Sequence, residues 1–247
     1  MSSRSELIVH THEHPGPALI ELTGVTKVYG SGAAATHALR GIDLRIEEGD
    51  FVAVMGASGS GKSTCLNIVG CLDTPTSGSY LFRGVEVSAL SRNQRALLRR
   101  HYLGFVFQGY NLLSRTSALE NVELPLVYRG IPRAERRRLA KDALAAVGLQ
   151  GREEHSPAEL SGGQLQRAAI ARALVTGPQV LLADEPTGNL DTARSIEIME
   201  LLTAFNRDKG TTIVLVTHET AMAAYADRIV QFVDGQVTSI VRHDEVA

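Results

Sequence analysis

The stretch GASGSGKST, residues Gly56 to Thr64, decides the fold of this 247-residue chain. It follows the apolar run Phe51 to Met55 and opens a helix predicted from about Lys62 to Gly70. Glycines let backbone N–H groups close around an anion, and a helix N-terminus adds its dipole. The pattern G-x-x-x-x-G-K-[ST] between strand and helix therefore predicts a phosphate-binding loop. The alternative is a glycine-rich turn that happens to precede Lys-Ser, and the strand–loop–helix context argues against it.

We expect every residue of this loop to take part in nucleotide binding. The Lys62 ammonium should reach the β- and γ-phosphates, and the Ser63 hydroxyl should ligate Mg²⁺. The predicted nucleotide-binding residues of the loop are Gly56, Ala57, Ser58, Gly59, Ser60, Gly61, Lys62, Ser63 and Thr64.

Two adjacent carboxylates follow a second apolar run. In VLLADEP, four apolar residues precede Asp184 and Glu185, so both acids should emerge at the C-terminal end of a buried strand. Ligands of parallel sheets bind at that edge. Asp184 suits the Mg²⁺ shell, and Glu185 should polarise the water that attacks the terminal phosphate. The alternative is that the paired acids cap a helix, which the preceding apolar run disfavours.

Three other polar side chains lie where they can complete a nucleotide site. Gln108 ends the predicted strand LGFVFQ, and His218 ends TTIVLVT, so both should point to the same sheet edge. We expect them to orient the water and sense the γ-phosphate, with Gln108 also reaching Mg²⁺. Tyr29, near the start of the fold, can stack on an adenine base. For Gln108 or His218 taken alone, the alternative is an ordinary loop residue. For Tyr29, the alternative is simple packing in the core.

Strands alternate with helices along most of the chain, which predicts a mainly parallel sheet. The first two strands are expected at Leu19 to Tyr29 and Gly41 to Ile46, joined by a flexible link at Gly30 to Thr36. Helical periodicity dominates from about 109 to 178, which indicates an inserted helical lobe. We therefore predict one domain over residues 19–247, ending in a hairpin around Asp234-Gly235.

Composition and charge limit the classes of function. Apolar residues make up 44% of the chain, charged residues 21%, and the formal net charge is −2. This charge offers no bulk field for nucleic acid. No apolar run approaches the ~18–20 residues of a membrane-spanning helix, and the N-terminus lacks the pattern of a signal peptide. We expect a cytoplasmic protein without direct membrane insertion, whose membrane role, if any, comes through a partner.

Cysteines and N-terminal histidines offer weak support for metal binding. Cys65 and Cys71 have no CxxC or Cys/His ligand spacing around them, so buried free thiols are expected rather than a disulfide or a metal site. His10, His12 and His14 alternate and are able to bind a metal. No carboxylate or cysteine framework accompanies them, so a disordered polar leader over residues 1–18 is expected instead.

The order of these motifs resembles that of ATP-binding-cassette subunits of ABC transporters, from about Leu19 to Val241. The matching pieces are GASGSGKST, Gln108, LSGGQ at Leu160 to Gln164, LLADEP, the segment Gly188 to Asp191, and Thr217-His218. The resemblance implies an α/β fold of the P-loop NTPase type: a RecA-like, mainly parallel core, an antiparallel β lobe and an inserted helical lobe. It also implies ATPase activity with ATP and Mg²⁺, in which Glu185, His218 and Gln108 are the catalytic residues.

The same resemblance implies that two copies close head to tail. The LSGGQ stretch of one copy then covers the ATP of the other, through Ser161, Gly162, Gly163 and Gln164. Backbone amides at a helix N-terminus are suited to the γ-phosphate. The segment Asn189, Leu190 and Asp191 would communicate between the two sites. The alternative is that SGGQ merely caps its helix, for which serine is well suited.

Longer stretches of the sequence narrow the resemblance to one subgroup of these cassettes. CLDTPTSGSY, LGFVFQGYNLL and LLADEPTGNLD are similar to cassettes of the lipoprotein-release and macrolide-export type, which work beneath a permease with few transmembrane helices. The segment after Gln108 is expected to form a groove for a short permease helix, placing the chain on the inner face of the membrane. A soluble ABC ATPase acting on a macromolecular complex is the alternative. Leu165 departs from the pattern, where Gln commonly follows LSGGQ.

Overall fold

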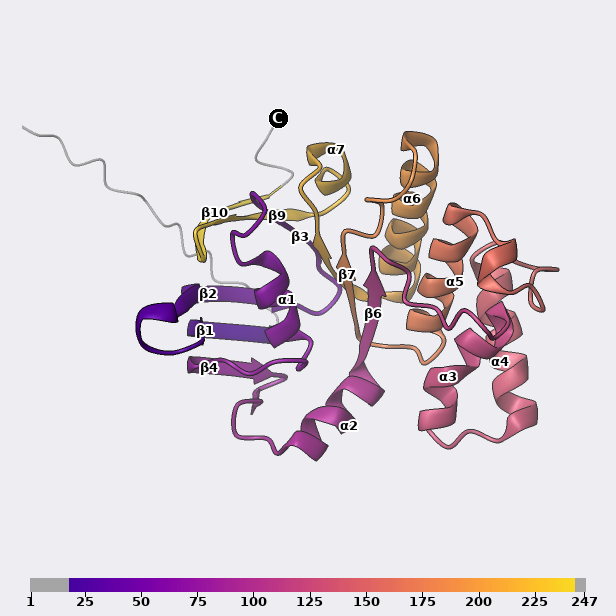
Figure 1. Ribbon diagram of the computed structural model, residues 1–247, viewed down its shortest axis with the longest axis horizontal. Coiled ribbons are helices and arrows are strands. Elements are labelled where there is room, and N and C mark those ends of the chain that lie inside the picture. The colour runs from indigo at the N-terminus through magenta and orange to yellow at the C-terminus, as the bar shows by residue number, and fades with distance from the viewer. Residues whose placement is uncertain (1–17, 243–247) are drawn as a thin grey trace, which may run out of the picture.

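The computed structural model describes residues 18–242, which form two sheets and a group of helices (Figure 1). The antiparallel sheet has the strand order β2-β1-β4-β5. Its strands are β1 (Ala18–Tyr29), β2 (Thr36–Glu47), β4 (Ser77–Phe82) and β5 (Val85–Glu86). It lies at one end of the molecule in Figure 1, opposite helices α3, α4 and α5.

The larger sheet has six strands in the order β10-β9-β3-β8-β7-β6. Strands β9, β3, β8, β7 and β6 pair in parallel, and only β10 is antiparallel to its neighbour. The strands are β3 (Phe51–Met55), β6 (Leu103–Phe107), β7 (Val180–Asp184), β8 (Thr212–Val216), β9 (Arg228–Val233) and β10 (Gln236–Arg242). The predicted mainly parallel core and antiparallel β lobe are both present.

The helices connect these strands in the predicted order. They are α1 (Lys62–Val69), α2 (Arg92–Tyr102), α3 (Ala118–Tyr128), α4 (Arg133–Ala146), α5 (Gly162–Leu174), α6 (Thr192–Lys209) and α7 (Thr220–Ala223). Helices α3, α4 and α5 pack on one another within the segment predicted as the helical lobe. Single 3₁₀ turns occur at Gly32–Ala34 and Pro157–Glu159.

The central strands β3, β7 and β8 are almost entirely apolar because both of their faces are covered. Alternate residues of a strand point to opposite faces of a sheet. In β7, Val180 and Leu182 join the core around α1, whereas Leu181 and Ala183 join the core shared with α5 and α6. The continuous apolar runs in the sequence therefore indicate a sheet that is buried on both sides.

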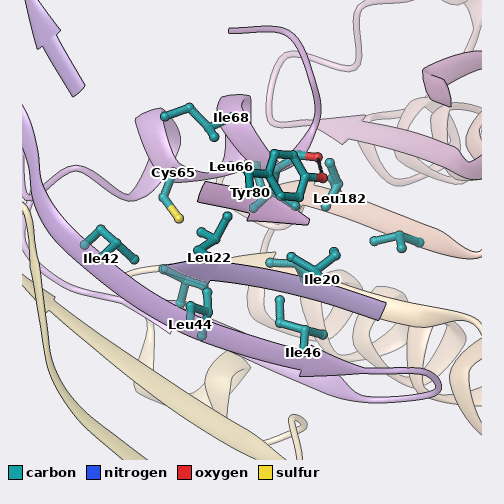
Figure 2. Packing of buried hydrophobic residues seen from close by; sticks show 14 of the residues in the cluster. Ile20, Leu22, Ile42, Leu44, Ile46, Cys65, Leu66, Ile68, Tyr80 and Leu182 are labelled. Atoms are coloured by element: carbon teal, nitrogen blue, oxygen red, sulfur yellow. Dashed lines mark hydrogen bonds between the residues drawn. The ribbon is translucent and has the colours of Figure 1, made fainter. Parts of the chain in front are cut away.

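The first of these cores joins the two sheets. Figure 2 shows Ile20 and Leu22 of β1 packed with Leu66 of α1, and Leu182 of the parallel sheet lies in the same cluster. Tyr80 is fully buried there, and its hydroxyl donates a hydrogen bond of 2.7 Å to the Val69 carbonyl. Because α1 begins at the glycine loop, this packing holds the loop between the antiparallel and the parallel sheet.

Two predicted boundaries differ from the structure at the N-terminal hairpin. The link predicted at Gly30 to Thr36 is shorter, because Thr36 already pairs with Tyr29 and opens β2, five residues before the expected Gly41. Strand β1 begins at Ala18, which the sequence had assigned to the leader. Because β1 pairs with β2, both strands are longer than the alternation of apolar and polar residues within each of them predicts. The leader and its three histidines otherwise lie outside the described residues.

The prediction of buried free thiols is confirmed. Cys65 and Cys71 are both free and buried. Burial raises the pKa of Cys65 to about 12. Burial also raises the pKa of Cys71, against the opposing effects of Tyr80, Arg99 and Arg95.

Both cysteines should therefore be silent toward thiol reagents in the folded protein. Such reagents attack the thiolate, and a raised pKa together with burial removes it near pH 8. Titration with an aromatic disulfide reagent should detect close to none of the two thiols natively and both of them in guanidinium chloride. Rapid reaction of either thiol in the native protein would contradict the packing of α1.

Candidate functional site

The glycine loop is held open by backbone geometry that only glycine accepts at two positions. Gly56 has φ +155°, and a Cβ there would collide with the Phe232 carbonyl. Gly61 has φ +103°, and a Cβ there would lie 2.6 Å from the Ala38 carbonyl oxygen. The Gly235 amide also donates to the Ser60 carbonyl at 2.9 Å. Strand β2 and the β9–β10 turn thus fix the shape of the loop before any ligand arrives.

Lys62 lies inside this loop rather than in solvent. Its side chain is buried, and its ammonium donates to the carbonyl oxygens of Gly56 and Ala57 at 2.8 Å each. The two carbonyls hold the positive charge within the glycine loop. The loop therefore combines a fixed cation, backbone donors and the N-terminus of α1, which is the chemistry that binds a phosphate chain.

The parallel register brings the other predicted groups to the same sheet edge. Phe107 pairs with Asp184, and Asp184 pairs with Val216, so Gln108, Glu185 and Thr217 follow the last paired residues of three neighbouring strands. Val216 also pairs with Val54 of β3, the strand that leads into the glycine loop. The predicted meeting of these side chains at one edge follows directly from this alignment.

Asp184 lies beside the glycine loop in a half-buried position. The Ser63 hydroxyl donates to its Oδ1 at 3.4 Å. Burial raises the pKa of Asp184, and the neighbouring Glu185 raises it further, whereas Ser63 and Lys62 oppose the shift. A carboxylate whose charge is disfavoured in this way gains from a cation beside it. The pair Ser63–Asp184 is thus suited to hold a divalent ion.

Glu185 is held in a strained backbone conformation next to His218. Its φ is +47°, in the left-handed region, and its N–H donates to the Val216 carbonyl at 2.9 Å. Such a conformation costs about 1–3 kcal/mol in a non-glycine residue and persists only where the surroundings impose it. Glu185 Oε1 lies 3.0 Å from His218 Nδ1. The imidazole therefore fixes the orientation of the carboxylate.

Gln108 and the segment after Glu185 are in contact. The Asn189 side-chain amide donates to the Gln108 carbonyl at 2.8 Å. A Cβ on Gly188 would come within 2.6 Å of Gln108 Nε2, so this glycine makes room for the Gln108 side chain. Asp191 caps α6 by accepting from the Arg194 amide at 2.9 Å. The predicted γ-phosphate sensor and the predicted communication segment thus form one connected surface.

Tyr29 lies at the end of β1 with 42% of its surface exposed, which is compatible with a stacking platform. Its hydroxyl donates to Asp73 Oδ2 at 2.8 Å. Burial, followed by the hydrogen bond and the charge of Asp73, raises the pKa of this phenol, whereas a hydrogen bond with Thr64 opposes the shift. Thr64 is the last residue of the glycine loop, so Tyr29 lies next to the phosphate-binding element.

The LSGGQ stretch begins α5, at a distance from the glycine loop of the same chain. Ser161 is the N-cap: its hydroxyl accepts from the Gln164 amide at 3.4 Å, and its own amide donates to Gln164 Oε1 at 2.9 Å. Figure 1 places the starts of α1 and α5 on opposite sides of the β6–β7 edge. The capping alternative is therefore real: it uses the backbone N–H groups of Ser161 and Gln164, and it leaves the O–H of the exposed Ser161 available.

The residues present fit ATP and Mg²⁺. Hydroxyl, carboxylate and amide oxygens from Ser63, Asp184 and Gln108 are the hard donors that Mg²⁺ prefers, and Mg²⁺ is commonly held by one or two carboxylates plus substrate phosphates. Within residues 18–242 no group of three or more His, Cys, Asp or Glu side chains gathers as a metal cage. The metal would thus depend on the phosphates for part of its shell.

Sequence patterns missed three side chains that support this site. Asp73 and Lys27 hold Tyr29, and they lie 46 positions apart in the sequence. Arg172, near the end of α5, donates to the backbone carbonyls of Tyr110 and Asn111 in the loop after Gln108. No spacing rule connects these residues. Leu165, by contrast, has a simple role, because its partly buried side chain packs against the core around α5.

A groove of about 910 Å³ lies away from the glycine loop, between α2, β6 and α3. Its lining is mainly apolar, with arginines from α2 and α5 at its margin. The lining residues are Leu72, Asn93, Ala96, Leu97, Arg99, Arg100, Leu103, Gly104, Phe105, Phe107, Asn111, Leu124, Pro125, Tyr128, Arg172, Ala173 and Thr176. Phe107 and Asn111 flank the Gln108 turn, so the groove and the sheet edge share one segment. In the described part of the chain, none of the helices is long and apolar enough to cross a membrane.

Comparison with curated proteins finds relatives among transport proteins. The macrolide export ATP-binding/permease protein MacB of Wolinella succinogenes is 52% identical over 220 residues, which cover 89% of this chain and 34% of the relative. The protein of the same name from Azoarcus sp. is 51% identical over 224 residues, covering 91% of this chain and 34% of the relative. The chain spans about a third of the length of these relatives.

Solved structures and a family profile give the same assignment. The dimeric post-hydrolysis structure of the ATP-binding cassette MJ0796, bound to ADP and Pi, has a TM-score of 0.84 and 43% identity, covering 91% of this chain and 98% of that one. A second dimeric structure of MJ0796 has the same TM-score at 44% identity and equal coverage. The profile described as ABC transporter matches residues 39–188. This chain therefore belongs to the ABC transporter family, as an ATP-binding cassette with ATPase activity.

Proposed function

We propose that this chain is the ATP-driven motor of a transporter of the macrolide-export and lipoprotein-release type. In this proposal two copies close head to tail around two ATP molecules and drive a permease with few transmembrane helices. The observation that carries the proposal is about 50% identity, across nine tenths of the chain, to proteins named macrolide export ATP-binding/permease. The cassette would work on the cytoplasmic side of the membrane, attached through the permease.

Each polar group at the sheet edge has a role in the proposed hydrolysis. The glycine loop and Lys62 bind the phosphates, while Ser63, Gln108 and Asp184 hold Mg²⁺, which would neutralise developing negative charge. Glu185 takes a proton from the attacking water. At the same time the water oxygen bonds to the γ-phosphorus, and the bond from that phosphorus to the ADP oxygen breaks. His218 keeps the Glu185 carboxylate in place, through the 3.0 Å contact with Oε1.

Replacing Glu185 with Gln should suppress turnover while ATP binding survives. The amide keeps the shape of the side chain but cannot accept the proton, and general-base help contributes about 10²–10⁴-fold to the rate. Phosphate release should fall by about a hundredfold or more, with ATP affinity within about threefold of the parent. The same exchange at the exposed Glu200 of α6 should leave both unchanged. Parent-like phosphate release by Glu185→Gln would refute the assignment.

The two ATP sites in this proposal need residues from both copies. The start of α5 is exposed through Ser161, and the side of the helix next to Gly162 is covered by Tyr110 and Leu190 of the same chain. Helix α1, which begins at the glycine loop, lies on the other side of β6 and β7 from α5 (Figure 1), so the amides that begin α5 would need a phosphate from another chain. A head-to-tail second copy supplies one, and the Asn189–Asp191 segment then lies at the junction of the two chains.

Ser161→Arg should block closure of the dimer but spare ATP binding by a single copy. An arginine at this point removes the hydroxyl and fills the space that the partner's nucleotide would occupy. In the Glu185→Gln background, light scattering with ATP should show dimer for Glu185→Gln alone and monomer for the double variant.

The matched control is Ser91→Arg at the start of α2. Ser91 is also an N-cap with a capping box, made with Gln94, so this variant loses a cap worth about 1 kcal/mol without touching α5. The control should still dimerise with ATP. A dimer formed equally well by Ser161→Arg would mean that α5 does not face the partner's nucleotide.

The groove between α2 and α3 is the proposed seat of the permease. A short amphipathic helix of the permease would place its apolar face on this lining. Leu97 and Tyr128 line the groove and are 45% and 69% exposed, respectively, a high exposure for large apolar side chains. Because Phe107 also lines the groove, movement of the seated helix would reach Gln108 through one peptide bond.

Leu97→Glu should detach the chain from its permease without affecting ATP. A buried charge at the centre of an apolar contact weakens binding by more than about tenfold. The measurement is recovery of a co-expressed permease of the macrolide-export type with the tagged chain from detergent-solubilised membranes. Val85→Glu, at an equally exposed apolar residue outside the groove, is the control and should keep the permease. Full recovery with Leu97→Glu would contradict the docking site.

A further inference from the structure

Tyr29 is fixed at both its ring and its hydroxyl by two residues that no motif identifies. The Lys27 ammonium lies 4.9 Å from the centroid of the Tyr29 ring. It also donates to Asp73 Oδ1 at 2.6 Å and to the Thr74 carbonyl at 2.8 Å. The second carboxylate oxygen of Asp73 accepts from the Tyr29 hydroxyl at 2.8 Å. One carboxylate thus holds both the ring and the cation beside it.

The Asp73 carboxylate is itself well anchored. Its Oδ1 also accepts from the Thr74 amide at 2.7 Å. Burial would raise the pKa of Asp73, but the hydrogen bonds from Lys27, Thr74 and Tyr29 lower it below its usual value. Lys27 is only 9% exposed, so this ion pair is shielded from solvent more than a surface pair would be. The contacts therefore have the geometry and the environment of a permanent clamp.

An exposed tyrosine at a strand end would otherwise rotate freely. Immobilising such a side chain on binding weakens affinity by about two- to tenfold in the general case. Here the Tyr29 side chain is already immobilised during folding, because its hydroxyl and its ring are both held before a base arrives. With the Lys27 ammonium on one side of the ring, the exposed part of the ring is left for a planar ligand.

We propose that Asp73 and Lys27 are positioning residues that fix the Tyr29 ring as a preformed platform for the adenine base. This inference rests on the proposed role of Tyr29 in adenine stacking. It adds that recognition of the base depends on the loop after α1, which carries Asp73, whereas α1 itself begins at the phosphate-binding loop. Helix α1 therefore connects the loop proposed to bind the phosphates with the loop that holds Tyr29, the residue proposed to bind the base.

The test compares two probes on the full-length chain: Mg²⁺–ATP, which has a base, and Mg²⁺–tripolyphosphate, which has none. Tyr29→Phe keeps the ring and loses the hydroxyl, and Asp73→Asn loses the carboxylate charge. Each should weaken ATP binding about three- to tenfold by calorimetry, the range expected when a fixed side chain becomes free. Affinity for tripolyphosphate should stay at the parent value. Asp208→Asn, at an exposed aspartate near the end of α6, is the matched control for both probes.

The double variant shows whether Tyr29 and Asp73 act through one shared contact or independently of each other. Tyr29→Phe with Asp73→Asn should weaken ATP binding no more than Asp73→Asn alone. The one amide oxygen of asparagine stays with Lys27 and the Thr74 amide, so Asp73→Asn already removes the acceptor of the Tyr29 hydroxyl. Lys27→Met, which keeps the stem and removes the charge, should fall in the same range. Additive losses in the double variant would contradict the clamp.

Other outcomes distinguish this inference from the proposal beneath it. If Asp73→Asn weakens tripolyphosphate as much as ATP, Asp73 merely supports the phosphate loop and the inference is wrong. If Tyr29→Ala weakens ATP by about tenfold, as loss of base stacking predicts, but Asp73→Asn has no effect, only the positioning role is wrong. If Tyr29→Ala leaves ATP affinity unchanged, the stacking role of Tyr29 is wrong and the positioning inference is overturned with it.

Discussion

Burial of both faces of the parallel sheet is the constraint on which the rest of the structure depends. Strands β3, β7 and β8 have apolar side chains on both faces, divided between two cores. A polar group cannot be placed within such a strand without losing its hydrogen bonds to water. Polar side chains can therefore gather only where the strands end. The aligned register makes those ends coincide, which is why Gln108, Asp184 and Glu185 meet at one edge beside the glycine loop.

Backbone strain also occurs at this edge. Glu185 follows the last residue of β7 in a left-handed conformation, and its amide is held by the Val216 carbonyl of β8. The packed strands on either side supply the free energy that this conformation costs. In return, the carboxylate turns toward His218 rather than continuing along the strand direction. The rigid apolar sheet and the strained conformation of Glu185 therefore depend on the same packed strands.

Local patterns predicted the parts of this structure that depend on local chemistry. The glycine loop, the buried strands and the capped start of α5 each follow from residues adjacent in sequence, and the structure contains them within a few residues of the predicted bounds. The longer β1–β2 hairpin was missed because strand pairing, rather than alternation, extends it to Thr36. Asp73 was missed for a similar reason: its role comes from Lys27 and Tyr29, which the fold brings to it from a distant strand.

Helix α5 connects the core that it shares with β7 and α6 to the loop that follows Gln108. Its apolar face, including Ala168 and Ile170, is fully buried in the core shared with β7 and α6. Its N-cap Ser161 is exposed, whereas Gly163 in its first turn is buried, and Arg172 in its last turn donates to the Tyr110 carbonyl at 2.9 Å, in the loop that follows Gln108. A helix packed this firmly moves as a unit, because close-packed interiors transmit displacement rather than absorb it. Arg172 thus ties the last turn of α5 to the loop that follows Gln108, so a displacement of α5 would carry this loop with it.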